Sequence, residues 1–389
     1  MGETTGTGHS VRQVHYVTNF VCDARRCIDS CCKCYEIVKV EDYLVDGYRT
    51  HAPNLLQHVR KEENGWVMNV DGNRTCSACI DDLCQVQVEC GPTFLPEICH
   101  SYPRRLTRLF GEVFITGNLP CNLMVESVLY GDTPFGWDTV NVERLPSNLA
   151  NTREADFGGH SAAELFDIHA HVMCLADNDS YTSEELLLRL LTLAGLLDGL
   201  RRSDWSYMIK GVVRTAAREH AIDHLSRLGG MKAGPEDTVH DLLYAVLTVV
   251  KHRDHGKISK LLREVAAMVD GHTPAALREK WGQCSASTPI EGVLKRYLQA
   301  RLVENLFPIA NWGDCVDDMA FIALCHTVLR LCLLARHEQL AGFTKVDEIV
   351  EIVTIVEKWY YGRRKELYSQ IIKMGWTSAE AVQVALVRW

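Results

Sequence analysis

The pattern of hydrophobic and polar positions divides the chain into two parts. Before residue 150 the apolar runs are short and are interrupted at Gly91-Pro92, Pro96, Pro103 and Pro120. Three of these runs are rich in β-branched or aromatic residues, and they predict short strands at residues 14–21, 65–70 and 112–116. We therefore expect a loop-rich N-terminal region that buries little apolar surface of its own.

The remainder of the chain has the spacing of α-helices. Thr182 and Ser183 precede Glu184-Glu185 and a leucine-rich run to Leu197, which predicts a capped helix. Further helices are predicted at residues 204–228, 238–252, 256–269, 291–306, 317–337 and 346–360. Because no period of 20–50 residues recurs, a bundle is favoured over a solenoid.

These patterns predict a mainly α protein with three regions. Residues 12–130 form a small, irregular, cysteine-rich, metal-binding domain with a few short strands. Residues 131–159 form a linker or surface loop, and residues 160–389 form an α-helical domain.

Composition limits the possible functions. The net charge of −9 argues against a nucleic-acid partner, and 47% hydrophobic residues provide ample material for a core. The first ten residues lack a signal pattern, and the most apolar stretch, 319–335, contains His326 and Arg330 and falls short of a membrane span. We expect a cytoplasmic protein without a membrane partner.

The number and clustering of the cysteines are the strongest indication of function in the sequence. Eleven of the 16 cysteines lie between Cys22 and Cys121, beginning with the run Cys22-x4-Cys27-x3-Cys31-Cys32. The others of this set are Cys34, Cys76, Cys79, Cys84, Cys90, Cys99 and Cys121. In a reducing compartment such density indicates metal ligation rather than disulfides.

Spacing alone does not identify the metal. Thiolates select zinc or an iron–sulfur cluster, with a 4Fe-4S cluster favoured here. Cys27-x3-Cys31-x2-Cys34 has the spacing of the radical S-adenosylmethionine motif, but Lys33 stands where an aromatic residue is usual, and no alternation of strand and helix follows. Buried structural cysteines are the remaining interpretation, and Cys325 and Cys332 are expected to be of that kind.

Other motifs are weaker. His169-x-His171 and His220-x3-His224 have spacings that can bind metal, although ordinary core or surface histidines are favoured. No G-x-G-x-x-G sequence occurs, and residues 157–160, FGGH, read as a turn.

Three cysteine motifs together resemble the flagellin lysine-N-methylase (FliB) family. They are the run from Asn19 to Cys32, the sequence Leu83-Cys84-Gln85-Val86-Gln87, and the sequence Cys99-His100-Ser101-Tyr102-Pro103-Arg104. Cys76 matches the leading cysteine of the C-x-x-L element, with Cys79 where leucine is usual, and Cys121 matches the last cysteine. A weaker likeness continues at Tyr297 to Pro308, so the resemblance extends from about residue 14 to residue 376.

The resemblance implies an iron–sulfur-dependent enzyme that uses S-adenosylmethionine to methylate lysine on a flagellin-like protein substrate. By position, the implied metal ligands are Cys22, Cys27, Cys31, Cys32, Cys76, Cys84, Cys99 and Cys121. Arg104 is a candidate for the cofactor carboxylate and Tyr102 for orienting or deprotonating the amine. The alternative for this pair is a turn-capping tyrosine and a surface arginine.

The chain departs from the family pattern in three places. Cys34-Tyr35 replaces Gly-Trp, Asn122-Leu123 replaces Pro-Glu, and residues 357–366 lack an Arg…His pair. The acceptor can therefore differ from flagellin. Two other classes stay open: a non-catalytic zinc or iron–sulfur module that docks a partner protein, and an iron–sulfur oxidoreductase.

Overall fold

The computed structural model describes most of the chain. The described residues are 9–18, 20–28, 30–33, 37–142, 145, 150–151, 157–218, 256–287, 290–310, 314–340, 342 and 346–360, with Glu366, Ser369 and Lys373 as single positions. The chain forms two compact units. Unit 1 comprises Met1–Arg108, Val113–Ser127 and Asp132–Ala150, and unit 2 comprises Leu109–Glu112, Val128–Gly131 and Asn151–Trp389.

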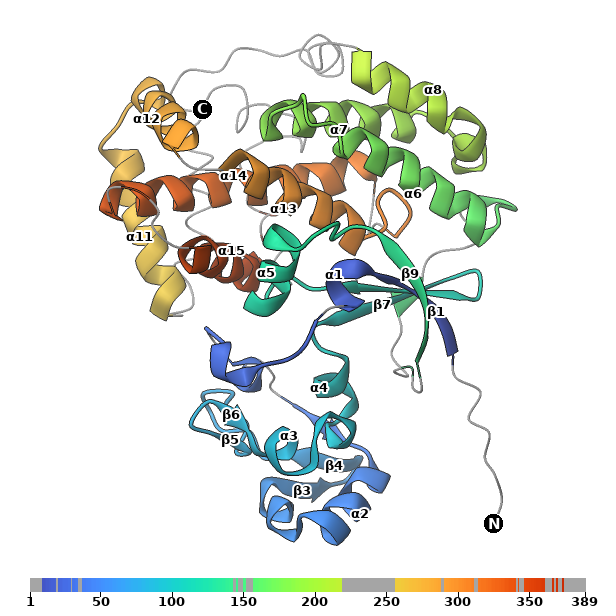
Figure 1. The fold of residues 1–389 in the computed structure, drawn as a ribbon, viewed down its shortest axis with the longest axis vertical. Helices are drawn as coiled ribbons and strands as arrows, with labels where there is room; N and C mark the ends of the chain where they lie inside the picture. Colours follow the sequence, from blue (N-terminus) through green and yellow to red (C-terminus); the bar gives the residue numbers. More distant parts are fainter. Residues whose placement is uncertain are drawn as a thin grey trace. The chain divides into compact units, whose positions relative to one another are not determined.

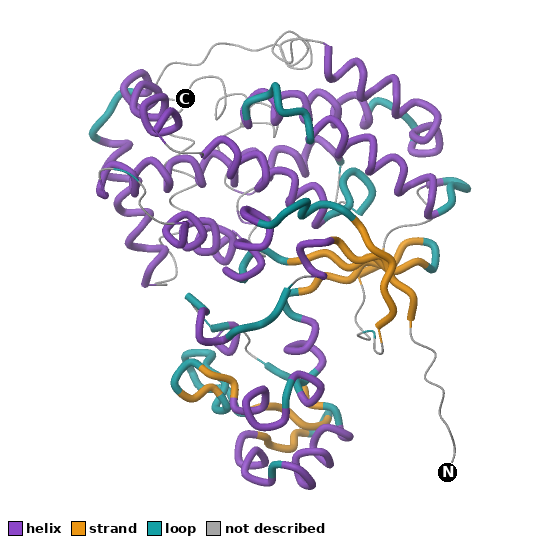
Figure 2. The backbone as a smooth tube through the Cα atoms, viewed as in Figure 1, coloured by secondary structure: helices purple, strands orange, loops and turns teal. Residues whose placement is uncertain are grey.

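The fold class is mainly α, as predicted. Within the described residues every strand lies before residue 152, and the later part is helical (Figure 2).

Unit 2 is a bundle of helices (Figure 1). Its described helices are α6 (Ala162–Ala176), α7 (Ser183–Asp198), η6 (Arg202–Asp204), α8 (Trp205–Arg218), α11 (Gly256–Asp270), α12 (Pro274–Ser287), α13 (Ile290–Glu304), α14 (Cys315–Leu340) and α15 (Val346–Tyr360). Helix α7 packs against α8, α13 and α14, and α14 also packs against α11, α12 and α15. The predicted helix at 238–252 lies outside the described residues, as does the end of the one at 204–228.

Local sequence sets where the first two helices of the bundle begin. The Thr182 hydroxyl accepts from the Glu185 N–H, and the Glu185 carboxylate accepts from the Thr182 N–H, which confirms the predicted cap. Ser161 and Glu164 form the same reciprocal pair at α6.

Helix α14 is the centre of unit 2. It is long and apolar enough to span a membrane by length and composition, and the whole of its most apolar window is buried inside the protein. Cys325 and Cys332 are fully buried on it, as expected of core cysteines. Its burial by the surrounding helices accounts for its apolar character.

A buried charged network joins α13 to α15. The Tyr297 hydroxyl donates to Glu357 Oε1 at 2.6 Å, and Arg301 Nη1 lies 3.2 Å from Glu357 Oε2 and 2.5 Å from Glu304 Oε2. Glu357, which begins the stretch without the Arg…His pair, is therefore a buried structural carboxylate.

Unit 1 contains a five-stranded sheet of order β10-β7-β8-β1-β9. The strands are β1 (His9–Val14), β7 (Arg104–Leu109), β8 (Glu112–Gly117), β9 (Trp137–Val142) and β10 (Ala150–Asn151). β1 runs parallel to β8 and antiparallel to β9. Short helix α1 (His15–Thr18) follows β1, and α5 (Asn122–Tyr130) follows β8.

Between β1 and β7 lies the cysteine-rich segment. Its elements are η1 (Ala24–Arg26), η2 (Cys31–Lys33), β2 (Lys39–Val40), α2 (Asp42–His51), η3 (Pro53–His58), β3 (Val59–Glu62), β4 (Gly65–Met68), β5 (Cys79–Ile80), β6 (Leu83–Cys84), α3 (Gln85–Cys90), η4 (Pro92–Phe94) and α4 (Glu97–Ser101). A small core around Leu44, Val45, Tyr48 and Leu55 holds these short elements together.

Two of the three predicted strands are confirmed, as β4 and β8. The strand predicted at 14–21 is wrong: β1 ends at Val14, and the chain turns into α1. The His15 and Tyr16 N–H groups donate to the carbonyls of Gly136 and Pro134, so a tertiary partner overrides the β-branched valines. The stretch 131–159, expected as linker or loop, contributes β9 and β10 to the sheet.

Candidate metal centre

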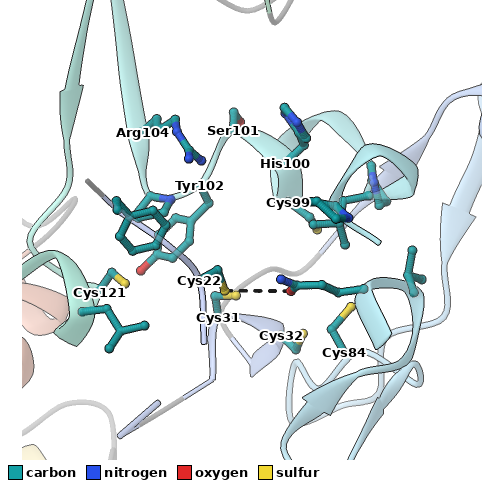
Figure 3. Close-up of a pocket in the computed structure, with 18 of the residues that line it drawn as sticks. Cys22, Cys31, Cys32, Cys84, Cys99, His100, Ser101, Tyr102, Arg104 and Cys121 are labelled. Carbon is teal, nitrogen blue, oxygen red and sulfur yellow. Dashed lines mark hydrogen bonds between the residues drawn. The ribbon is translucent and has the colours of Figure 1, made fainter. Parts of the chain in front are cut away.

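One cavity of about 1000 Å³ in unit 1 is lined by all of the candidate ligands (Figure 3). Its lining includes Cys22, Cys27, Cys31, Cys32, Cys76, Cys84, Cys99 and Cys121, together with Tyr102 and Arg104. Every described cysteine is a thiol. The fold therefore brings the three separate cysteine motifs to a single place.

The first loop presents Cys22 and Cys27. Cys22 Sγ lies 3.9 Å from Oε1 of Gln87, which also lines the cavity (Figure 3). Asp23 caps η1 by accepting from the Arg25 N–H, and Cys27 ends the turn with its N–H on the Ala24 carbonyl. The short turn fixes both ends of the Cys22-x4-Cys27 spacing.

Cys31 and Cys32 lie on the next turn, η2. The Cys32 N–H donates to Ser30 Oγ at 3.3 Å, and the Cys32 carbonyl accepts from the Cys76 N–H at 2.9 Å. This second bond ties the first cysteine motif to the second by the backbone itself.

A tight hairpin presents Cys84. Asp81 and Asp82, both with positive φ, make the two-residue turn between β5 and β6, as a type I′ hairpin requires. Lys33 lies 2.5 Å from Asp82 and so joins the hairpin to η2.

The third motif runs from α4 into β7. Glu41 accepts from the Glu97 N–H at the start of α4, which contains Cys99. Tyr102 ends that helix, and Arg104 begins β7, so one short segment places a thiol, a phenol and a guanidinium on the cavity wall.

Cys121 completes the lining at the start of α5. Its carbonyl accepts from the Val125 N–H in the first helical turn. The next residue, Asn122, bonds the backbone of the first cysteine loop at Arg26 and Ile28. Asn122 thus has a structural role in holding this loop.

Several of the thiols are close to Cys32. Hydrogen bonds from Cys31 and Cys84 lower the pKa of Cys32 to about 3, with further contributions from Ser30 and Cys79. The pKa values of Cys31 and Cys84 are raised, first by those hydrogen bonds to Cys32 and then by burial. The thiols of this group therefore share protons through hydrogen bonds, and metal binding would displace those protons.

Arg104 lines the same cavity, near Cys22 and Cys121. Burial lowers the pKa of Arg104, while the charges of Cys22 and Cys121 oppose that shift. Its guanidinium lies over the Phe20 ring at 5.4 Å, and the described residues give it no carboxylate partner. Arg104 is a partly buried cation that faces thiols, not the predicted alternative of a surface arginine.

Among the described residues no group of three or more His, Cys, Asp or Glu side chains is arranged to hold a metal ion. The cavity therefore gathers thiols, the soft ligands that zinc and iron–sulfur clusters share, in an arrangement that does not itself distinguish the two.

The other candidate sites are structural where the structure describes them. His169 is buried, with Nδ1 3.0 Å from the Phe307 carbonyl, and His171 Nδ1 lies 2.7 Å from the Asp167 carbonyl. Residues 157–160 form a turn with positive φ at Gly158 and Gly159. His220 and His224 lie outside the described residues, as do Cys34 and Tyr35.

Sequence reasoning missed three residues of this region. Gln87 was read only as part of a motif, yet it bonds Cys22. Cys79 was set aside because leucine is usual there, and Asn122 was noted only as a departure. For Cys79 the missed signal was its place two residues before a two-aspartate turn, with Cys84 two residues after that turn.

Comparisons of the chain with protein-family models, with curated proteins and with solved structures return no match.

Proposed function

We propose that the cysteine-lined cavity of unit 1 holds an iron–sulfur cluster, and that the protein methylates lysine side chains of a protein substrate with S-adenosylmethionine. The observation that carries the proposal is the common cavity. Motifs separated in sequence, and named by their resemblance to the flagellin lysine-N-methylase family, all reach it together with Tyr102 and Arg104.

The donor set suits the cluster. The thiols are soft ligands, they come from short loops, and eight of them line one cavity, which is enough for a cluster with four cysteine ligands. When bound, such a cluster with an open iron position supplies a Lewis acid for the amino and carboxylate groups of the methyl donor.

The size of the cavity suits a second occupant. A volume of about 1000 Å³ is at the upper end of small-molecule sites, which leaves room for S-adenosylmethionine beside the cluster. The lining also includes apolar side chains such as Val17, Leu106 and Ile115, which exclude water from a methyl transfer.

Arg104 recognises the carboxylate of the methyl donor. Its guanidinium borders the cavity near Cys22 and Cys121 and has no carboxylate partner among the described residues. A guanidinium donates two parallel hydrogen bonds to a carboxylate, which fixes orientation as well as affinity.

Tyr102 orients the acceptor amine. It lies two residues before Arg104 on the same wall (Figure 3). Its hydroxyl accepts a hydrogen bond from a lysine ammonium and, as phenolate, takes the proton that the amine must lose before it can attack a methyl group.

The test is direct. Protein purified without oxygen is analysed for iron and sulfide, and then incubated with S-adenosylmethionine and candidate proteins that are examined by mass spectrometry. Lysine mass increments of one methyl group support the proposal. Bound zinc without iron would favour a docking module, and an iron–sulfur centre that cycles electrons but never binds S-adenosylmethionine would favour an oxidoreductase.

A further inference from the structure

Cys79 and Cys84 lie directly opposite each other in the hairpin of β5 and β6. The Gln85 N–H donates to the Ala78 carbonyl at 2.8 Å, so residues 78 and 85 are a hydrogen-bonded pair. Because such pairs alternate along an antiparallel ladder, Cys79 and Cys84 are a non-hydrogen-bonded pair. Their side chains therefore stand close together on one face of the hairpin.

The geometry of this pair suits a disulfide. Non-hydrogen-bonded partners have Cα atoms about 4.5 Å apart, which is at the short end of the 4.4–6.8 Å range of disulfides. A bridge at that limit is reduced more readily than an unstrained one. The pair is half-buried rather than sealed, so a small oxidant can reach it.

Other disulfide pairings among the nearby thiols are less favourable. Cys31 and Cys32 are consecutive residues, so their Cα atoms are about 3.8 Å apart, which is below the range of disulfides. Cys32 also contacts Cys79 and Cys84, but it lies on η2, a separate turn that is joined to the hairpin by side-chain contacts such as the Lys33–Asp82 ion pair. Cys79 and Cys84, by contrast, are held opposite each other by strand pairing.

We propose that Cys79 and Cys84 form a reversible disulfide that withdraws Cys84 from the metal centre, so that the hairpin is a site of oxidative modification. The withdrawal rests on the proposed function, because Cys84 is one of the proposed cluster ligands. The disulfide itself rests on the hairpin alone. Cys79 does not line the cavity, so we assign it as the partner that oxidises with Cys84 and not as a metal ligand.

A peroxide is the chemical class of oxidant. One thiol reduces hydrogen peroxide, becoming a sulfenic acid and releasing one water. The sulfur of the second thiol attacks that sulfur, the S–S bond forms, and the hydroxyl leaves with the thiol proton as a second water. Two thiols and one peroxide thus give one disulfide and two waters, and a dithiol reductant reverses the change.

The experiment maps disulfides in the full-length apoprotein after exposure to hydrogen peroxide. Unreacted thiols are alkylated, and peptides are analysed by mass spectrometry without reduction. We expect a Cys79–Cys84 linkage that a dithiol reverses. Iron uptake is then measured: the oxidised wild type should take up several-fold less iron than the reduced wild type, and Cys79→Leu or Cys79→Ser should lose that difference.

Cys90→Ser is the matched control, since Cys90 is another thiol of this segment outside the cavity lining. It should retain both the linkage and the loss of iron uptake. A disulfide between Cys84 and Cys32, or alkylation of Cys79 after oxidation, would overturn the proposed Cys79–Cys84 disulfide. Equal iron uptake before and after oxidation would overturn the proposal that the disulfide withdraws Cys84 from the metal centre. If even reduced protein took up no iron, the proposed function would fail while a mapped linkage would still stand.

Discussion

The side-chain amide of Asn122 donates a hydrogen bond to the backbone carbonyl of Arg26 at 2.8 Å. The same amide accepts from the Ile28 N–H through Oδ1 at 3.4 Å, and Arg26 pairs with Glu126 one turn further along α5. Two candidate ligands, Cys27 and Cys121, are the immediate neighbours of these contacts. The Asn122 side chain therefore joins the loop segment around Cys27 to the chain at Cys121.

Replacing Asn122 should loosen the first cysteine loop. Asn122→Ala leaves a carbonyl and an N–H without their partner, at an expected cost of about 1–3 kcal/mol. We expect faster hydrogen exchange in residues 24–28 and lower iron content after reconstitution. Asn54→Ala, which removes an exposed amide that bonds Glu89, is the control; equal effects of the two variants would contradict the assignment.

Arg104→Ala should weaken binding of S-adenosylmethionine by roughly tenfold to a hundredfold and leave iron content intact. The estimate is the loss of a charge-assisted hydrogen-bonded pair, worth about 1.5–3 kcal/mol. Calorimetry with anaerobic, iron-loaded protein measures it. Arg105→Ala changes the next residue of β7, outside the cavity lining, and should bind normally; unchanged affinity in Arg104→Ala would end its assigned role.

Cys31→Ala should lower iron content and solubility together. The thiol belongs to the group around Cys32, and metal binding also stabilises the loops that supply the ligands. Cys174→Ala, at an exposed thiol on α6, is the matched substitution and should bind iron as the wild type does. Full iron content in Cys31→Ala would remove Cys31 from the ligand set.

Unit 2 should lose stability on acidification. Burial lowers the pKa of His169 to about 4 and that of His326 well below its usual value, with Arg330 adding to the shift of His326. The unfolded chain therefore binds protons first, so stability is constant above about pH 6.5 and falls below it by up to about 1.4 kcal/mol per pH unit for each histidine. Urea unfolding followed by circular dichroism at several pH values measures this loss.

His326→Leu separates the contribution of that histidine. Both of its ring nitrogens lack a hydrogen-bond partner in the described structure, so leucine removes a titrating group without breaking a bond. We expect the free energy of unfolding of this variant to fall less steeply than that of the wild type between pH 6.5 and 5, and to differ little from it at pH 7.5. An unchanged acid slope would show that His326 does not titrate on unfolding.

Local sequence rules predicted most of the described helices after residue 160, although they did not predict α6 or α12. The Thr182–Glu185 cap, the start of α11 at Gly256 and the buried face of α14 all depend on residues within a few positions of one another. The strand at Trp137–Val142 was missed because its partner, β1, lies more than a hundred residues earlier. Sequence periodicity is evaluated in a short window, so it cannot show that two segments so far apart pair as strands.

The candidate ligands, and the expectation that they act as a set, came from motif resemblance, whereas the contacts that bring them to one cavity could not be predicted. Nothing in the spacing of Cys76, Cys99 and Cys121 says that they share a cavity; short contacts such as the Cys76 N–H on the Cys32 carbonyl decide it. The roles of Asn122 and Cys79 were not predicted for the same reason. Each depends on a contact that only the folded chain makes, with the loop at Arg26 for Asn122 and with Cys84 for Cys79.

The strand order of unit 1 also bears on how the protein is made. β1 has β8 and β9 as its neighbours, and both are synthesised long after it. Every cysteine from Cys22 to Cys121 is translated before Trp137–Val142 emerges as β9, the second neighbour of β1. The thiols of unit 1 are therefore synthesised before its sheet can be complete, so we expect insertion of the proposed cluster to follow translation of β9.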